Sequence, residues 1–150
     1  MSAGSQTENG TQALRTHKTE VRVRYADTDQ GGVVYNANYL VFLEIGRTEL
    51  MRSIGCPYAE LEARGLVMPV FETQLKFRSP AVYDDLLVVA TELTELGRVR
   101  MRFDSKVMRA SDRCLLAEGY VRLACTNGKG KPVAIPADAL ALMKQHLLRG

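Results

Sequence analysis

The sequence lacks the features that mark membrane, secreted and metal-binding proteins. Its 150 residues contain no run approaching the roughly 18 apolar residues that span a bilayer. The first residues, MSAGSQTENGTQALRTHK, are polar and include no apolar signal segment, so we expect a cytoplasmic protein in a reducing compartment. Three cysteines without a Cys-x-x-Cys pair, together with two histidines, argue against a disulfide framework and a zinc site. We expect Cys56, Cys114 and Cys125 to be small buried residues.

A strong excess of one charge is also missing. The formal net charge is +3, too small to indicate that the chain binds nucleic acid over its whole surface. The positive charge is instead local, because six basic residues stand against two acidic ones between Arg98 and Arg113. This basic segment lacks the interleaved aromatic residues of a nucleic-acid stacking platform. It therefore predicts either a solvated strand face or a surface that contacts a small anionic ligand.

A chain of this length is expected to form one domain around one hydrophobic core. Residues 1–16 are rich in Ser, Thr, Gln and Gly and predict a tail outside that core, which leaves residues 17–150 as the domain. Apolar and polar residues alternate over residues 18–27, where Val21, Val23 and Tyr25 predict the inward face of a first strand. Similar patterns predict four later strands, over residues 67–78, 86–96, 98–107 and 115–126.

Three helices are predicted from helical spacing of apolar residues and from stop signals. The first covers residues 36–53 and stops at Gly55, the second runs from Pro57 to residue 64, and the third opens at Pro136. This order has no strand-helix-strand alternation, so it predicts an α+β fold with an antiparallel sheet. Residues 39–43 are apolar all round, which indicates a central helix that the sheet encloses. A second copy of the chain is expected to cover what the sheet leaves open.

The segment between the first strand and this helix carries the strongest motif. It reads YADTDQGGVVYNANY over residues 25–39, with the spacing Asp-x-x-Gly-x-Val-x-x-x-Asn-Tyr from Asp29 to Tyr39. This motif strongly resembles the signature of the 4-hydroxybenzoyl-CoA thioesterase family, hotdog-fold acyl-CoA thioesterases that include members associated with the Tol-Pal envelope system. The later sequences YLVFLEIGRTE and KFRSPAVYDDL fit the same family. The resemblance covers most of the chain.

The resemblance implies a hotdog fold, a curled antiparallel sheet of about five strands around a central helix, and hydrolysis of an acyl-CoA to free acid and coenzyme A. The catalytic carboxylate of the family matches Asp29, as nucleophile or general base. The backbone N–H that polarises the thioester carbonyl matches Asn36. This fits the chemistry of a carboxylate beside a helix N-terminus, where unpaired N–H groups stabilise an oxyanion. The family needs no metal or cofactor, since coenzyme A is part of the substrate, and it implies a homodimer paired into a homotetramer.

The expected substrate-binding residues lie in two groups. The motif supplies the first group, Gly32, Val33, Tyr35, Asn38 and Tyr39. Basic residues expected to meet the phosphates of coenzyme A at the surface supply the second group, Arg78, Arg98 and Arg100. Position 36 departs from many Tol-Pal-associated relatives, which carry His there. Because Asn cannot transfer a proton, only the backbone role remains at this position.

Several residues have a structural alternative to a functional role. Asp29 is also a residue type that forms turns, and Asp27 is a second candidate for the acting carboxylate. Gly31 and Gly32 either permit close approach of the substrate or only satisfy turn geometry, and Asn38 and Tyr39 either line the site or cap and pack the helix. Glu44 follows an apolar run and is either a buried general base or the partner of Arg47 or Thr48 on the same helix. His17 and His146 are expected at the surface.

Two other functions compete with the thioesterase hypothesis. The first is a hotdog dehydratase, whose site typically contains a histidine paired with an acidic residue, and the motif here has no His. An acyl-CoA-binding protein without catalysis would keep the pocket but would not need Asp29. Release of a thiol from a panel of acyl-CoAs separates the enzyme from both alternatives.

Overall fold

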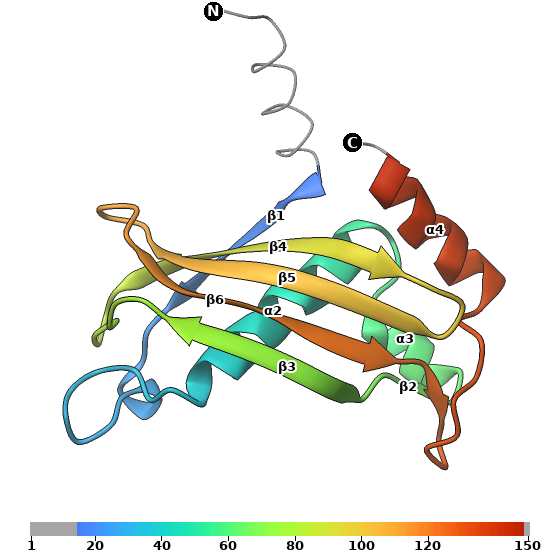
Figure 1. The fold of residues 1–150 in the computed structure, drawn as a ribbon, viewed down its shortest axis with the longest axis horizontal. Helices are drawn as coiled ribbons and strands as arrows, with labels where there is room; N and C mark the ends of the chain where they lie inside the picture. The colour runs from blue at the N-terminus through green and yellow to red at the C-terminus, as the bar shows by residue number, and fades with distance from the viewer. Residues whose placement is uncertain (1–14, 149–150) are drawn as a thin grey trace, which may run out of the picture.

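A five-stranded antiparallel sheet with one long helix along a face forms the centre of the fold, as the computed structural model of residues 15–148 shows (Figure 1). The spatial order of the strands is β1-β4-β5-β6-β3. The strands are β1 His17–Arg22, β3 Val70–Phe77, β4 Leu86–Leu96, β5 Arg100–Arg109 and β6 Leu115–Ala124. The helices are α2 Asn38–Ser53, α3 Tyr58–Ala63 and α4 Ala137–Leu148. These elements confirm the predicted α+β fold, its sheet of about five strands and its three helices.

The two faces of the sheet differ in chemistry, as the alternation of the sequence predicted. On β5, Met101, Phe103 and Val107 are buried, whereas Arg100 and Lys106, at alternate positions, are exposed. Since successive side chains of a strand point to opposite faces, the buried set faces α2 and the charged set faces outward. The core therefore lies between the sheet and α2.

Helix α2 approaches the sheet most closely at Gly46. A Cβ atom at this position would overlap the Thr91 hydroxyl and would lie 2.8 Å from Cγ1 of Val89. Thr91 is fully buried on β4 and shares a hydrogen bond of 3.2 Å with Ser105 on β5. Because only a hydrogen atom fits between this helix turn and the strands, Gly46 sets the distance between α2 and the sheet.

The sheet does not enclose α2 completely. Leu40 is 39% exposed and Val41 is 43% exposed, although the all-apolar start of the helix predicted burial on every side. The neighbouring edge strand β3 also exposes Val70, Phe71 and Phe77. One side of α2 and the β3 edge are thus apolar and uncovered, and this part of the expectation of an enclosed helix is wrong for the single chain.

The first strand is shorter than predicted. It ends at Arg22, and Tyr25–Asp27 forms a 3-10 turn instead of continuing the strand to residue 27. The Asp27 carboxylate accepts a hydrogen bond of 2.9 Å from the backbone N–H of Arg24, which closes this turn. Tyr25 is consequently 74% exposed rather than inward-facing.

Other segments add detail to the predicted order. Residues 66–67 and 126–127 form a separate two-stranded ladder, β2 Leu66–Val67 with β7 Thr126–Asn127, which the sequence patterns did not reveal. His146, expected at the surface, is buried on α4 with its Nε2 atom 3.2 Å from the carbonyl of Arg15. Of the expected tail, residues 1–14 lie outside the described residues, and Thr16 donates a hydrogen bond to Glu92 at 2.7 Å.

Within residues 15–148, no helix combines the length and apolar character needed to cross a membrane. Cys56 and Cys125 are buried as expected, and burial raises the pKa of both thiols, whereas Cys114 is only partly buried.

We predict that Gly46→Ala lowers the free energy of unfolding by about 1–3 kcal/mol, because the added methyl group must displace Thr91 or push α2 from the sheet. Urea denaturation followed by circular dichroism measures this change. Gly128→Ala is the matched control, since a Cβ atom at Gly128 meets nothing within 4 Å. Equal stability of the two variants would contradict the packing role of Gly46.

Candidate functional site

The loop between β1 and α2 is held against the start of the helix by backbone hydrogen bonds. The N–H of Tyr35 and the side-chain amide of Asn38 both donate to the carbonyl oxygen of Asp27, at 2.9 Å and 2.8 Å. The N–H of Val34 donates to the carbonyl of Ala81 at 2.9 Å, which ties the loop to the segment that follows β3. The loop containing the motif is therefore a fixed part of the fold.

Asp27 is the buried carboxylate of this loop, with 3% of its surface exposed. Its two oxygens accept hydrogen bonds from the backbone N–H and the guanidinium of Arg24, at 2.9 to 3.3 Å. Burial by itself raises the pKa of Asp27, but the hydrogen bonds and charge of Arg24 outweigh burial and hold the pKa below its usual value. Asp27 is thus an ionised structural residue with both oxygens occupied.

Asp29 is exposed and forms the corner of the next turn. Its Oδ1 accepts a hydrogen bond from the N–H of Gly31 at 2.8 Å, and its backbone N–H donates to the carbonyl of Val33 at 2.9 Å. Gly32 follows in the left-handed region with φ of 82°, a conformation that favours glycine. One carboxylate oxygen therefore shapes the turn, while Oδ2 has no hydrogen-bond partner in the described chain. The turn-forming and catalytic interpretations of Asp29 are compatible.

The first N–H groups at the start of α2 are open. The helix begins at Asn38, two residues after the predicted start, and Ala37 provides no side-chain cap. Within residues 15–148 the backbone N–H groups of Asn36 and Ala37 make no hydrogen bond. Unpaired N–H groups at the positive end of a helix dipole stabilise a nearby anion. This arrangement is suited to polarising a carbonyl and holding the oxyanion that forms from it.

The structure keeps the other motif residues together but gives them different environments. Val33 is half-buried and pairs with Val82, whereas Tyr35 is exposed at the surface of the loop. Asn38 uses its side chain to hold Asp27, as described above. Tyr39 is buried in the core, with its ring in edge-on contact with Phe42 and Phe77 at 5.7 Å and 5.5 Å between centroids. In the single chain, Tyr39 therefore has a packing role and presents no surface to a ligand.

The three basic candidates do not all lie near Asp29. Arg22 pairs with Leu86 and Phe77 pairs with Ala117, so the motif loop and Arg78 share one end of the sheet, which we call the motif end. Arg98 and Arg100 lie at the opposite end, where Met101 pairs with Leu96. At about 3.3 Å per residue, the length of β4 separates the two ends by roughly 30 Å. The structure therefore brings Arg78, but not Arg98 and Arg100, close to Asp29 of the same chain.

The basic segment is also partly neutralised. Arg102 forms ion pairs with Asp104 and Glu95, and Arg109 forms ion pairs with Asp85 and Asp112. Arg100 lies over the ring of Phe71 at 5.1 Å and is still exposed. Only part of the predicted local charge excess is therefore available to an anionic ligand.

Sequence reasoning missed an aromatic pair at the motif end. The rings of Tyr25 and Tyr83 stack at 3.8 Å between centroids, with 9° between their planes, and both side chains are exposed. The predicted extension of the first strand to residue 27 placed Tyr25 on the inward face, so its exposure was missed, whereas Tyr83 belongs to the segment KFRSPAVYDDL that fits the family.

Glu44 also differs from expectation: it is exposed, and it forms no ion pair with Arg47 within the described residues.

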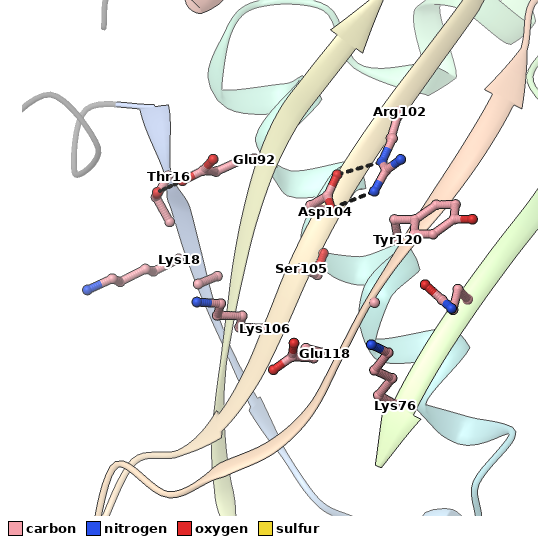
Figure 2. A pocket seen from close by; sticks show the side chains of 13 residues that line it. Thr16, Lys18, Lys76, Glu92, Arg102, Asp104, Ser105, Lys106, Glu118 and Tyr120 are labelled. Carbon is pink, nitrogen blue, oxygen red and sulfur yellow. Dashed lines mark hydrogen bonds and ion pairs between the residues drawn. The ribbon is translucent and has the colours of Figure 1, made fainter. Parts of the chain in front are cut away.

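A cavity of about 590 Å³ lies on the outer face of the sheet, away from the motif loop. Figure 2 shows its lining, in which Arg102 holds Asp104 with two hydrogen bonds of 2.9 and 3.1 Å and lies over the ring of Tyr120. Lys76, Lys106 and Glu118 come from three neighbouring strands (Figure 2). Because charges of both signs alternate here, the cavity is not suited to a strongly anionic ligand.

Among residues 15–148, no group of three or more His, Cys, Asp or Glu is arranged to hold a metal ion.

Comparison with known proteins places this geometry among thioesterases. The thioesterase-like superfamily pattern matches residues 23–143. The chain is 40% identical over 123 residues to the acyl-CoA thioesterase YbgC of Haemophilus influenzae, covering 81% of this chain and 89% of that protein. It also superimposes on the hypothetical protein TT1821 from Thermus thermophilus with a TM-score of 0.81 and 39% identity, covering 85% of this chain and 97% of that one.

A further solved structure is similar in fold at lower identity. It is a mutant 4-hydroxybenzoyl CoA thioesterase complexed with 4-hydroxybenzoyl CoA, with a TM-score of 0.77 and 23% identity over 86% of this chain and 99% of that chain. At this identity the likeness concerns the fold alone, and it confirms the predicted hotdog fold.

We predict that Asp27→Asn lowers the free energy of unfolding by about 1 kcal/mol at pH 7, because it removes charge-assisted hydrogen bonds to Arg24. The folded-state pKa of Asp27 lies below the ordinary value of about 3.9, so the stabilisation is present above that pH. It is lost as the pH falls from about 4 through the lower folded-state pKa. Denaturation curves of both proteins from pH 7 to pH 2 should therefore converge at the acid end. A constant difference across this range would contradict the role of an ionised Asp27.

Proposed function

The chain belongs to the thioesterase-like superfamily, and on that premise we propose that it hydrolyses acyl-CoA thioesters to a free acid and coenzyme A. The observation that carries the proposal is the position of the exposed Asp29 carboxylate in a loop fixed against the open N–H groups of Asn36 and Ala37. The 40% identity to a named acyl-CoA thioesterase supports the same reaction.

In this mechanism the thioester carbonyl oxygen accepts hydrogen bonds from the open N–H groups at the start of α2. The free oxygen of Asp29 then either attacks the carbonyl carbon or takes a proton from the water that attacks it. The carbon–sulfur bond then breaks, and coenzyme A leaves as a thiolate that takes up a proton. Where water attacks, the free acid forms in this step; where Asp29 attacks, the acyl group stays on Asp29 as a mixed anhydride, and water hydrolyses it to release the acid and restore the carboxylate. Asn36 takes part through its backbone, so its side chain needs no acid–base function.

Asp27 and Asp29 have separate roles in this proposal. Both oxygens of Asp27 are occupied by Arg24, and its carbonyl holds the helix start through Asn38. Asp27 therefore positions the loop, and Asp29 reacts with the substrate.

The functional unit in this proposal is a homodimer, paired into a homotetramer. The β3 edge has unpaired backbone groups beside exposed Phe71 and Phe77, and an open apolar edge favours pairing with another strand. Two copies related by a two-fold axis would pair their β3 strands antiparallel. The Val70 end of one strand would then lie beside the Phe77 end of the other.

This pairing gives Arg98 and Arg100 a place in the site. They lie at the end of the sheet far from Asp29 of their own chain, and Arg100 contacts Phe71 near the start of β3. An antiparallel dimer moves that end toward the motif end of the other copy. Coenzyme A phosphates would then meet Arg78 of one chain with Arg98 and Arg100 of the other. Exposed contacts of this kind are weak individually and screened by salt.

We predict that Asp29→Asn lowers kcat by at least about 10²-fold with little change in substrate affinity, because it removes a group that acts only in the transition state. Thiol release from a panel of acyl-CoAs measures kcat, and calorimetric titration measures affinity. Asp27→Asn is the matched control and should lose less activity under conditions where it remains folded. If Asp29→Asn kept most of its activity while Asp27→Asn lost it, the two roles would be reversed.

The homodimer predicts that no folded monomer is stable at micromolar concentration. Sedimentation velocity should show a dimer or tetramer for the unaltered chain. Val70→Lys, which places a charge on the β3 edge, should shift the distribution toward monomer, whereas Glu20→Lys on the other edge strand β1 should not. A stable folded monomer of the unaltered chain would exclude the dimeric site.

A further inference from the structure

Residues 80–85, the segment between β3 and β4, lie against the motif loop. Three consecutive residues of this segment each contact a different residue of the loop or of the turn before it. A shift of the segment would therefore move the loop that contains Asp29. The contacts are the backbone hydrogen bond of 2.9 Å between Val34 and Ala81, the antiparallel bridge between Val33 and Val82, and the ring stacking between Tyr25 and Tyr83.

The guanidinium of Arg109, at the end of β5, holds both ends of the 80–85 segment. Its Nη2 donates to the carbonyl of Pro80 at 2.9 Å, and its Nε donates to Oδ2 of Asp85 at 3.3 Å. The same Asp85 oxygen accepts the N–H of Val82 at 3.0 Å. The Nη1 of Arg109 bonds Asp112 at 2.7 Å, which orients the guanidinium from the other side. Because arginine presents its donors in a rigid planar fork, one side chain fixes the two ends of the segment relative to each other.

The segment has few other means of keeping this shape. Pro80 has no N–H to donate, and Asp84 has φ of 70°, in the left-handed region that residues other than glycine rarely adopt. The backbone of Asp84 and Asp85 exchanges hydrogen bonds of 2.9 and 3.0 Å with Val23, which ties that end to the sheet. At the other end, the hydrogen bond that the Pro80 carbonyl accepts comes from Arg109. The Pro80 end of the segment therefore depends on Arg109.

Tyr39 of α2 reaches the same segment from the helix side. Burial raises the pKa of Tyr39, whereas a hydrogen bond from the Ala81 backbone and the charge of Arg109 oppose that rise. The Tyr39 hydroxyl thus lies beside the residue whose carbonyl accepts the N–H of Val34. The 80–85 segment is consequently held between Arg109 on the sheet and Tyr39 on the helix whose start carries the open N–H groups.

Resting on the proposed thioesterase function, we infer that Arg109 is a positioning residue for Asp29. Arg109 holds residues 80–85, and these residues keep the motif loop at the distance from the open N–H groups that the reaction needs. A displacement of about 1 Å between reacting groups can lower a rate by roughly 10²-fold. Arg109 therefore acts on kcat through Asp29, and the basic residues proposed to bind coenzyme A do not depend on it.

The test compares Arg109→Met with Arg102→Met in thiol release from the acyl-CoA that the unaltered protein hydrolyses fastest. Arg102 is the matched control, because it lies on the same strand, is 24% exposed against 23% for Arg109, and also bonds an aspartate, Asp104 on the outer face (Figure 2). We expect Arg109→Met to lower kcat by at least about tenfold with KM nearly unchanged, and Arg102→Met to leave both within about twofold. Arg109→Lys should lose less activity than Arg109→Met, since an ammonium group can bond one end of the segment.

Two further measurements separate positioning from a general loss of structure. In the Asp29→Asn protein, Arg109→Met should cause little further loss of kcat, because the group that Arg109 positions is already absent. Hydrogen exchange of the peptide that covers residues 27–36 should be faster in Arg109→Met, whereas exchange in α4 should be unchanged. Urea denaturation followed by circular dichroism verifies that each variant is folded under the assay conditions.

Three outcomes overturn the inference: equal kcat of Arg109→Met and Arg102→Met, an undiminished effect of Arg109→Met in the Asp29→Asn protein, or unchanged exchange of residues 27–36. If Arg109→Met does not fold, Arg109→Lys provides the same comparisons with Arg102→Lys as its control. If the unaltered protein releases no thiol from any acyl-CoA, the proposed function fails, and hydrogen exchange alone decides whether Arg109 positions the loop. Faster exchange in the Arg109 variant would then retain that role, and unchanged exchange would refute it.

Discussion

The close approach of α2 to the sheet at Gly46 is the contact on which the rest of the structure depends. A side chain at this position would overlap Thr91 and Val89, so the helix can rest on β4 and β5 only because glycine is present. This contact fixes the helix axis relative to the strands. It therefore also fixes the helix start, where Asn38 holds the loop containing Asp29 through the carbonyl of Asp27. A substitution at Gly46 would therefore affect the site by displacing α2 rather than through a direct contact.

The same packing leaves one side of the helix uncovered. A five-stranded sheet covers only one face of α2, so Leu40 and Val41 remain exposed beside the open β3 edge. An apolar surface of this kind on a single chain favours association with another copy. One geometric fact, a helix half covered by its own sheet, thus underlies the proposed dimer.

The motif loop places two carboxylates two residues apart in opposite environments. Asp27 is buried and bonded to Arg24, which holds its pKa low and uses both of its oxygens. Asp29 is exposed and has one oxygen without a partner in the described chain. The two residues are of the same type and lie two positions apart. Their separate roles therefore follow from the burial of Asp27 and from its contact with Arg24.

The sequence by itself determined the α+β class, the five long strands and the helices, because apolar periodicity and glycine or proline stops act locally. The motif over residues 25–39 also determined the family. Only the tertiary structure decided that β1 ends at Arg22, that Tyr39 is a core residue, and that Arg98 and Arg100 lie far from Asp29 of their own chain. Such outcomes depend on which strands pair and where helices cross them, and contacts between residues distant in sequence leave no periodic signal in the chain.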